Sequence, residues 1–146
     1  MKGALFLCLL ALSGPALAEP LIVDNGRLFI TARINGVQTE ALLDSGAEAT
    51  LVNPVLAREA KFGPGKPVRM KGSGGEQDVS VVPNVSIEAL GQIIAPTDVV
   101  VMDMTDLSTR LIKRPTRAIV GREVFDAAER GLNVSENLRC LTGADA

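Results

Sequence analysis

Hydrophobic and polar residues alternate along residues 28–34, where every second side chain is aliphatic. A period of two is typical of a β-strand that is buried on one face. Asn35-Gly36 follows, a dipeptide that strongly favours a tight hairpin turn. Residues 37–43 are again rich in apolar side chains, and Asp44 comes directly after them. The pattern therefore predicts a β-hairpin that carries an acidic residue at the end of its second strand.

Two further features predict a short helix and a glycine-rich hairpin. Asn53-Pro54 has the composition of a helix start, an N-cap followed by proline in the first turn, and we expect this helix to continue to Arg58. Residues 68–71 and 79–82 read as two strands that flank Gly72, Ser73, Gly74, Gly75 and Glu76. A glycine-rich tip between paired strands predicts a mobile hairpin, although an ordinary flexible loop explains the same composition equally well.

The rest of the chain continues the series of strands and adds a second helix. Strands are expected at 85–90, 92–95, 98–102, 132–134 and 138–141, and a polar loop at 103–115. Residues 118–122 weakly repeat the apolar-apolar-x-Gly pattern around Asp44. Residues 123–130 have helical composition, and Gly131 fits a helix C-cap. No low-complexity linker interrupts the pattern, so we predict one mostly β domain.

Composition narrows the classes of function that this domain can have. The chain has 146 residues, enough for one domain with a sizeable core. Aromatic residues make up only 3% and the formal net charge is −2, so neither base stacking nor a basic surface supports nucleic-acid binding. The chain contains no histidine, which removes Ser-His-Asp and Cys-His catalysis and the commonest zinc sites. We expect no metal and no cofactor, and acid–base chemistry would rest on carboxylates, lysine or hydroxyls.

The N-terminus has the pattern of a secretory signal peptide. Lys2 precedes the apolar run 4–12, and Ala16-Leu17-Ala18 is a small-x-small cleavage site. We therefore predict a signal peptide at 1–18, a mature domain at 19–146, and a periplasmic or secreted location with no stable membrane span after cleavage. The apolar run is too short to span a bilayer, and the alternative is a membrane anchor that stays uncleaved. Cleavage would leave Cys140 as the only cysteine, so no internal disulfide is expected.

The chemistry is concentrated where the apolar run 41–43 meets Asp44-Ser45-Gly46-Ala47. An acid followed by a small hydroxyl residue and a glycine suits a tight turn, so we expect Asp44 at a buried, sharply turned strand end. A buried acid is costly to ionise, and acids with strongly shifted pKa values in clefts are candidates for catalysis. The alternative is an acid that caps its own turn through the loop amides, which is the usual role of an isolated Asp-Ser-Gly triplet.

This segment resembles the active-site motif of the retropepsin-like aspartic proteases: two apolar residues, Asp, Ser or Thr, Gly and Ala. The resemblance extends to the preceding hairpin, the glycine-rich hairpin, and Ile119-Val120-Gly121-Arg122 followed by a helix. It implies an all-β fold, a closed β-barrel with one or two short helices, and a flap whose tip is Gly72, Ser73, Gly74 and Gly75. It also implies that segment 119–122 packs beside the active-site loop.

Aspartic proteolysis needs two carboxylates that share one proton across a water molecule. The chain has one Asp-Ser/Thr-Gly triplet, so the resemblance implies a homodimer in which each chain supplies one Asp44. Ser45 would hydrogen-bond across the dimer axis, Gly46 would leave room for water and substrate, and Ala47 would lie under the bound peptide. By the same resemblance, Glu48 and Arg122 would pair and brace the loop, although both could equally be solvated surface charges.

These observations predict an exported, homodimeric aspartic endopeptidase that acts on peptides or proteins. Two other interpretations remain open. The first is a binding module with the same fold, whose dimer groove holds a peptide or a partner without cutting it. The second is a small structural β-protein of the cell envelope in which Asp-Ser-Gly is a coincidence.

Overall fold

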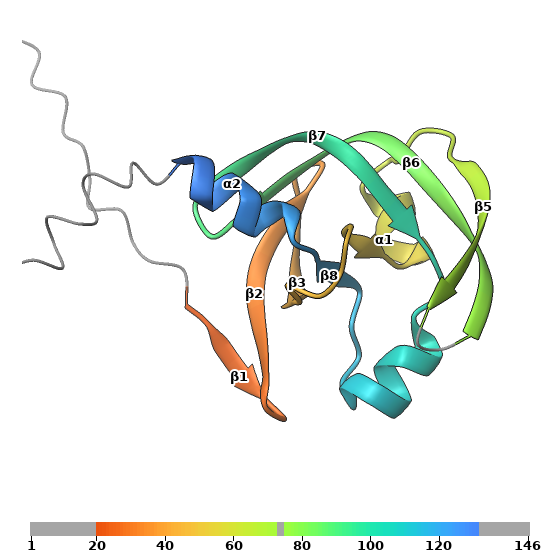
Figure 1. The fold of residues 1–146 in the computed structure, drawn as a ribbon, viewed down its shortest axis with the longest axis horizontal. Helices are drawn as coiled ribbons and strands as arrows, with labels where there is room; N and C mark the ends of the chain where they lie inside the picture. Colours follow the sequence, from red (N-terminus) through yellow and green to blue (C-terminus); the bar gives the residue numbers. More distant parts are fainter. Residues whose placement is uncertain (1–19, 73–74, 132–146) are drawn as a thin grey trace, which may run out of the picture.

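The computed structural model describes residues 20–72 and 75–131 (Figure 1). The predicted signal peptide, residues 73–74 at the tip of the glycine-rich hairpin, both predicted terminal strands and Cys140 lie outside the described residues. Within them the chain is mostly β-strand with a few short helices, as expected for an all-β protein.

The hairpin that ends at Asp44 forms as the alternating pattern predicts. Strand β2 (Arg27–Ile34) pairs antiparallel with β3 (Val37–Leu43) across the turn Asn35-Gly36, where both residues have positive φ values of 46° and 80°. Strand β1 (Ile22–Asp24), which the sequence pattern did not predict, pairs with β2 through a second Asn-Gly turn at residues 25–26. The same dipeptide signal was present there, but the strand before it is only three residues long.

The predicted strands of the middle of the chain merge into longer ones. Strand β5 (Lys66–Gly72) pairs with β6 (Gly75–Ala89), and β6 pairs with β7 (Gln92–Val101). The expected breaks at 83–84 and at 96–97 are therefore wrong. The β6–β7 register shifts between Val82 and Val85 and again between Val85 and Ile87, so irregularities within the ladder absorb residues that the sequence pattern assigned to a loop.

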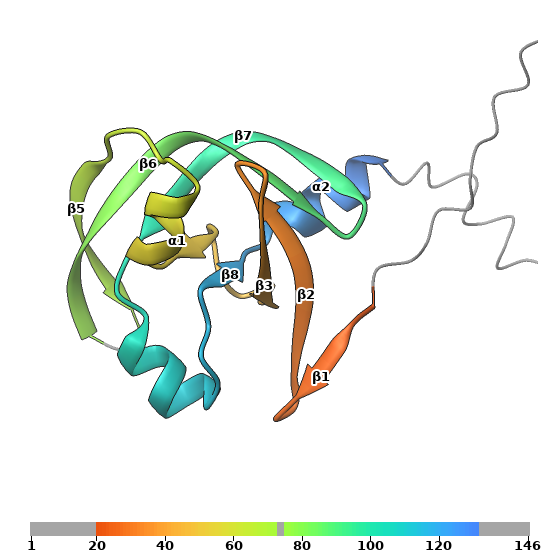
Figure 2. The same ribbon diagram turned by 180° about the vertical axis from the view of Figure 1, so that it is seen from behind.

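The strands are joined in a ring. Short strands β4 (Leu51–Val52) and β8 (Ala118–Val120) complete the order β2-β3-β8-β4-β7-β6, and a β6–β2 pairing closes it (Figure 2). The all-β class is confirmed. The barrel implied by the resemblance takes the form of this ring, in which β4 and β8 supply only two and three residues.

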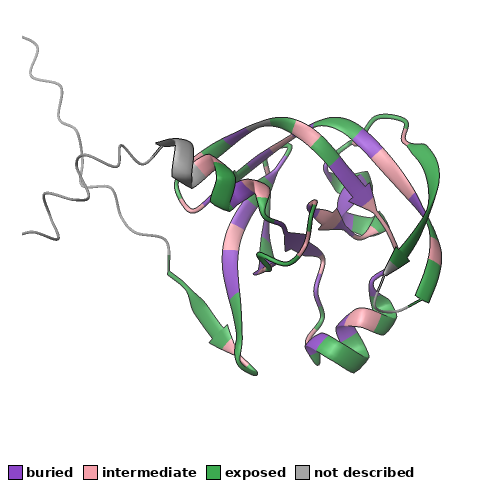
Figure 3. Cartoon of the chain, in the orientation of Figure 1, coloured by how far each residue is buried: buried purple, intermediate pink, exposed green. Residues whose placement is uncertain are grey.

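Two apolar clusters hold the ring together. The larger, built on Ile30, Ile34, Val52, Ile87 and Val120, fills its interior and contacts both α-helices. The smaller consists of Phe29, Leu42, Met104, Ile112 and Ile119, all buried. Leu42 and Ile119 belong to the smaller cluster and Val120 to the larger, since side chains alternate between the faces of a strand. Buried positions follow the strands in this alternation (Figure 3).

Three helical segments within residues 20–72 and 75–131 flank the ring. Helix α1 (Pro54–Glu59) begins as predicted, because Asn53 Oδ1 accepts a hydrogen bond from the Leu56 amide at 2.8 Å. Helix α2 (Glu123–Gly131) also matches its prediction. The predicted loop at 103–115 is wrong in part, because Leu107–Ile112 form a π-helix, η1, whose buried Ile112 packs in the smaller cluster. None of the helices in the described part of the chain is long and apolar enough to cross a membrane.

Candidate active site

Asp44 lies at the C-terminal end of β3, on a loop that β8 holds in place. Leu42 and Leu43 pair in parallel with Ile119 and Val120, and the Asp44 amide continues the ladder by donating to the Val120 carbonyl at 3.0 Å. The predicted packing of segment 119–122 beside this loop is therefore present.

The loop turns back on itself at once. The Gly46 amide donates to Asp44 Oδ1 at 2.9 Å, and the Ala47 amide donates to the Asp44 carbonyl at 3.2 Å. These bonds fix one carboxylate oxygen against the loop. They are also the contacts that an acid capping its own turn would make, so this geometry alone does not separate the two interpretations of Asp44.

The side chains of this loop differ from the sequence expectation in their exposure. Asp44, Ser45 and Gly46 are all exposed in the single chain, so the sequence-based expectation that Asp44 is buried is wrong. Only the apolar residues that lead into the turn, Ala41 and Leu42, are buried. Strand β3 therefore delivers the acid to the surface of the chain.

The second half of the loop is fastened to the start of α2. The Arg122 amide donates to the Ala47 carbonyl at 2.9 Å, and the Gly121 amide donates to Thr50 Oγ1 at 3.2 Å. Thr50 is fully buried, and its own amide donates to Glu123 Oε1 at 2.7 Å. The contacts that brace this half of the loop thus come from backbone groups, from the Thr50 hydroxyl and from Glu123.

The predicted pair between Glu48 and Arg122 is not formed among the described residues. Both side chains are exposed, and the guanidinium of Arg122, which directly precedes α2, lies 4.0 Å from the Asp126 carboxylate in that helix. Sequence reasoning missed Thr50 and Glu123. The available signal was an acidic residue in the first turn of the helix that follows Gly121-Arg122, a position where a carboxyl can reach free backbone N–H groups.

The glycine-rich hairpin has two chemically different faces. In the β5–β6 register Val68 lies opposite Val79 and Met70 lies opposite Gln77, so these four side chains share a face. Val79 is buried, and Gln77 Nε2 donates to the Asp103 carbonyl at 3.2 Å, so this face is directed toward the domain. The other face carries exposed charges, including the Arg69–Glu76 ion pair. At the tip, Gly72 pairs with Gly75 on either side of Ser73 and Gly74, which are outside the described residues.

The segment that contains η1 packs against the strands that carry the Asp44 loop. Ala47, Leu51, Met102 and Leu107 are partly buried against the smaller cluster, which joins β3 and β8 to Met104 and Ile112. Thr105 holds the start of this segment, because its hydroxyl and its amide both donate to Asp103 Oδ1. These hydrogen bonds, the one from the hydroxyl first, hold the pKa of Asp103 below its usual value. Ala47 thus packs on a surface that η1 helps to form.

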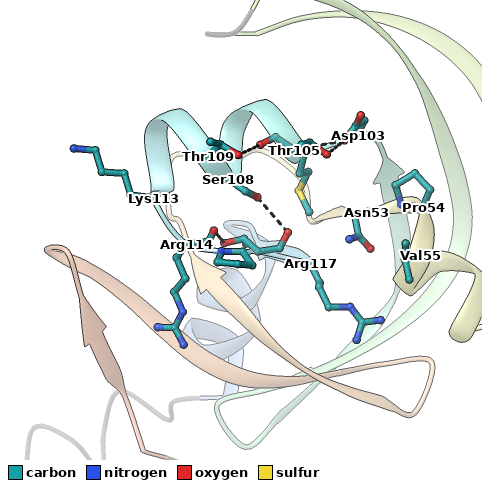
Figure 4. Close-up of a pocket in the computed structure, with 13 residues that line it drawn as sticks. Asn53, Pro54, Val55, Asp103, Thr105, Ser108, Thr109, Lys113, Arg114 and Arg117 are labelled. Atoms are coloured by element: carbon teal, nitrogen blue, oxygen red, sulfur yellow. Dashed lines mark hydrogen bonds between the residues drawn. The ribbon is translucent and has the colours of Figure 1, made fainter.

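A cavity of about 770 Å³ lies between the start of α1, η1 and residues 113–117 (Figure 4). Asn53 and Val55 lie on one side of it and Ser108 and Thr109 on the other, while Lys113 projects away. Its lining includes no residue of the Asp44 loop. Because Arg117 precedes β8 and Asp44 lies beside the end of β8, this cavity and the acid lie toward opposite ends of that strand.

Comparison with known proteins identifies a family whose sequence model covers the Asp44 loop and the segments that hold it. A search of curated proteins found no match. The sequence model of a family described as "Aspartyl protease" matches residues 30–123, more than half of the chain. The match runs from β2 through the Asp44 loop to Glu123 at the start of α2, and so it spans the segments that fasten the loop. The chain therefore belongs to the retropepsin-like aspartyl protease family.

Proposed function

We propose that the mature chain is an exported aspartic endopeptidase that works as a homodimer. A water molecule between two Asp44 carboxylates, one from each chain, would attack the peptide carbonyl. One carboxylate takes the proton from the water while the other, protonated, supports the carbonyl oxygen. The substrate is a peptide or protein, and neither a metal nor a cofactor enters the reaction.

The observation that carries this proposal is the exposure of Asp44 on a loop that is held at both ends. The Asp44 amide donates a hydrogen bond to the Val120 carbonyl of β8, and Thr50 at the other end of the loop is buried. An acid that served only to cap a turn has no need of a loop fixed in this way. An acid that must meet its symmetry mate across a twofold axis has to lie at the surface of its own chain, because residue and symmetry mate meet there.

The neighbours of Asp44 have roles that follow from this arrangement. Ser45 is exposed beside the acid, where its hydroxyl would bond across the dimer axis. A Cβ at position 46 would come within 3.2 Å of Asp44 Oδ1, so glycine keeps space open next to the carboxylate. The inward face of the β5–β6 hairpin, on which Val68 is 42% exposed and Met70 38% exposed, would cover the peptide as a flap.

Export also belongs to the proposal, since it rests on the signal-like residues 1–18, which lie outside the described residues. Cleavage after Ala18 would release a mature domain that begins at Glu19, in the periplasm or outside the cell. N-terminal sequencing of the protein recovered from the exporting host would test this directly, and an intact Met1 would leave the membrane-anchor alternative.

Substitution of Asp44 by asparagine is the experiment that tests the catalytic assignment. The change keeps a side-chain oxygen that can accept from the Gly46 amide, so the loop should hold its shape and the melting temperature should stay near that of the wild type. Cleavage of a diverse peptide pool should fall by at least about 100-fold, because general acid–base catalysis contributes roughly 10²–10⁴ in rate.

The matched control is Asp106→Asn, which removes an exposed carboxylate far along the chain and should leave cleavage unchanged. If Asp44→Asn cleaved at the wild-type rate, the catalytic role of Asp44 would be wrong. If the wild type bound peptides from the pool but cleaved none, the same fold would be acting as a binding module.

A further inference from the structure

We propose that Glu123 is a positioning residue for the Asp44 loop, an inference that rests on the proposed peptidase function. Glu123 is the first residue of α2, and its Oε1 accepts the amide of Thr50 at 2.7 Å. The two residues are 73 positions apart in the sequence. This bond therefore joins the helix that follows β8 to the end of the loop that carries the acid.

Thr50 is fixed by three hydrogen bonds, two to the junction between β8 and α2 and one to β7. Its amide donates to Glu123, its carbonyl accepts from the Val100 amide at 3.0 Å, and its hydroxyl oxygen accepts from the Gly121 amide at 3.2 Å. The side chain of Thr50 has no exposed surface. Of these three bonds, the one to Glu123 is made by a side chain outside the loop, so it is the one that a substitution can remove cleanly.

The composition of the loop explains why such a bond matters. Residues 45–47 are Ser, Gly and Ala, and position 49 is Ala, so the loop has few large apolar side chains with which to pack. Hydrogen bonds to its backbone must hold it instead. Because a displacement of about 1 Å can cost a large part of a catalytic rate, an anchor at Thr50 would act on Asp44 through the loop.

The other carboxyl oxygen of Glu123, Oε2, provides a way to test whether the loop depends on the Oε1 acceptor or on the whole carboxyl group. Oε2 is buried, and no hydrogen-bond partner for it is found among the described residues. Glutamine at this position keeps the Oε1 acceptor for Thr50 and replaces Oε2 with an amide group of similar size. Alanine removes both atoms. A positioning role that depends on the acceptor predicts that Glu123→Gln retains function and Glu123→Ala loses it.

The experiment compares Glu123→Ala, Glu123→Gln and the exposed control Glu88→Ala in the mature chain, with kcat and KM measured per folded protein. For Glu123→Ala we expect kcat to fall about 10-fold or more and KM to change by less than about twofold, since a displaced acid mainly affects the chemical step. Glu123→Gln should keep kcat within about threefold of the wild-type value, and Glu88→Ala should have the same kcat as the wild type.

Amide hydrogen exchange of Thr50 supplies a second readout that needs no activity. The Thr50 amide should be protected in the wild type and in Glu123→Gln, and should exchange faster in Glu123→Ala. Wild-type kcat in folded Glu123→Ala would overturn the proposal, and so would a loss in Glu123→Gln equal to that in Glu123→Ala. If the wild type had no peptidase activity, the proposed function would fail separately, and an unprotected Thr50 amide would then overturn the anchor itself.

Discussion

At the scale of single residues, the closest fit in the active-site region is at Gly121. A Cβ built at this position would lie 2.6 Å from Glu123 Oε2, 2.8 Å from the Ala47 carbonyl oxygen and 2.8 Å from the Ala49 carbonyl carbon. The carboxyl oxygen could move away, but the two backbone atoms belong to the Asp44 loop. A side chain at 121 would therefore push the loop itself.

We predict that Gly121→Ala lowers the free energy of unfolding by about 1–3 kcal/mol, as overpacking of a tight site does, and reduces peptide cleavage at the same time. Denaturant unfolding measures the first effect. Gly63→Ala is the control, because its Cβ would meet no atom within 4 Å and its φ is not in the left-handed region. Equal stability of the two variants would contradict this prediction, because it would show that the loop backbone accommodates a Cβ at position 121 without cost.

Arg122, by contrast, acts mainly through its backbone. Its amide binds the Ala47 carbonyl, while its side chain is exposed and lies 4.0 Å from Asp126. The sequence resemblance had implied that a partly buried ion pair with Glu48 would brace the loop. Exposed pairs of this kind contribute between zero and about 1 kcal/mol, so the guanidinium has little part in holding the loop of this single chain.

At the scale of elements, Arg114 links the segment after η1 to the first three strands. Its guanidinium pairs with Asp24 of β1 at 3.2 Å and with Glu40 of β3, and it lies 4.4 Å from the centre of the Phe29 ring of β2. Its side chain is 26% exposed. The planar guanidinium suits both the two carboxylates and the aromatic ring.

We predict that Arg114→Ala destabilises the chain by about 1–2 kcal/mol, between the values for exposed and for buried ion pairs. Arg114→Lys should recover only part of this loss, because an ammonium group cannot bind both acids and stack on Phe29 in the same way. Thermal unfolding at low and moderate salt measures both variants. Arg110→Ala, which removes a pair with Asp106 that is about three-quarters exposed (74% and 72%), is the control and should have little effect. If Arg114→Ala lost no more stability than Arg110→Ala, the contacts of Arg114 would not stabilise the fold.

At the scale of the whole molecule, the chain carries half of the proposed site. With one Asp-Ser-Gly triplet per chain, two chains must meet to place two carboxylates around one water. Both the concentration dependence and the pH dependence of activity should reflect this. The pH profile should be bell-shaped, and its two limbs should belong to the pair of acids together.

We predict that specific activity falls on dilution below the dissociation constant of the dimer, because the active species then scales with the square of chain concentration. An excess of Asp44→Asn chains should inhibit the wild type by forming dimers with a single acid. Peptide cleavage assays across a dilution series, with and without the variant chain, measure both effects. Constant specific activity together with no inhibition would show that a single chain is active.

Local sequence determined much of this protein. The alternation of apolar and polar residues and the Asn35-Gly36 turn predicted the hairpin that ends at Asp44. Asn53-Pro54 predicted the start of α1. Both predictions hold because turns and caps depend on residues that are adjacent in the chain. The motif around Asp44 also predicted the neighbouring position of segment 119–122, which the β3–β8 pairing confirms.

Tertiary structure decided what depends on contacts between distant residues. The β6–β2 pairing closes the ring, and shifts of register let β6 continue through Pro83-Asn84, where the sequence suggested a break. The anchor between Thr50 and Glu123 joins two residues 73 positions apart, so local sequence marks Glu123 as an acid at a helix start but does not identify Thr50 as its partner. Exposure of Asp44 likewise follows from how the loop is held against Val120, Gly121 and Arg122. The sequence determined which acid stands at the end of the strand, and packing between segments far apart in the chain determined where that acid points and what holds it there.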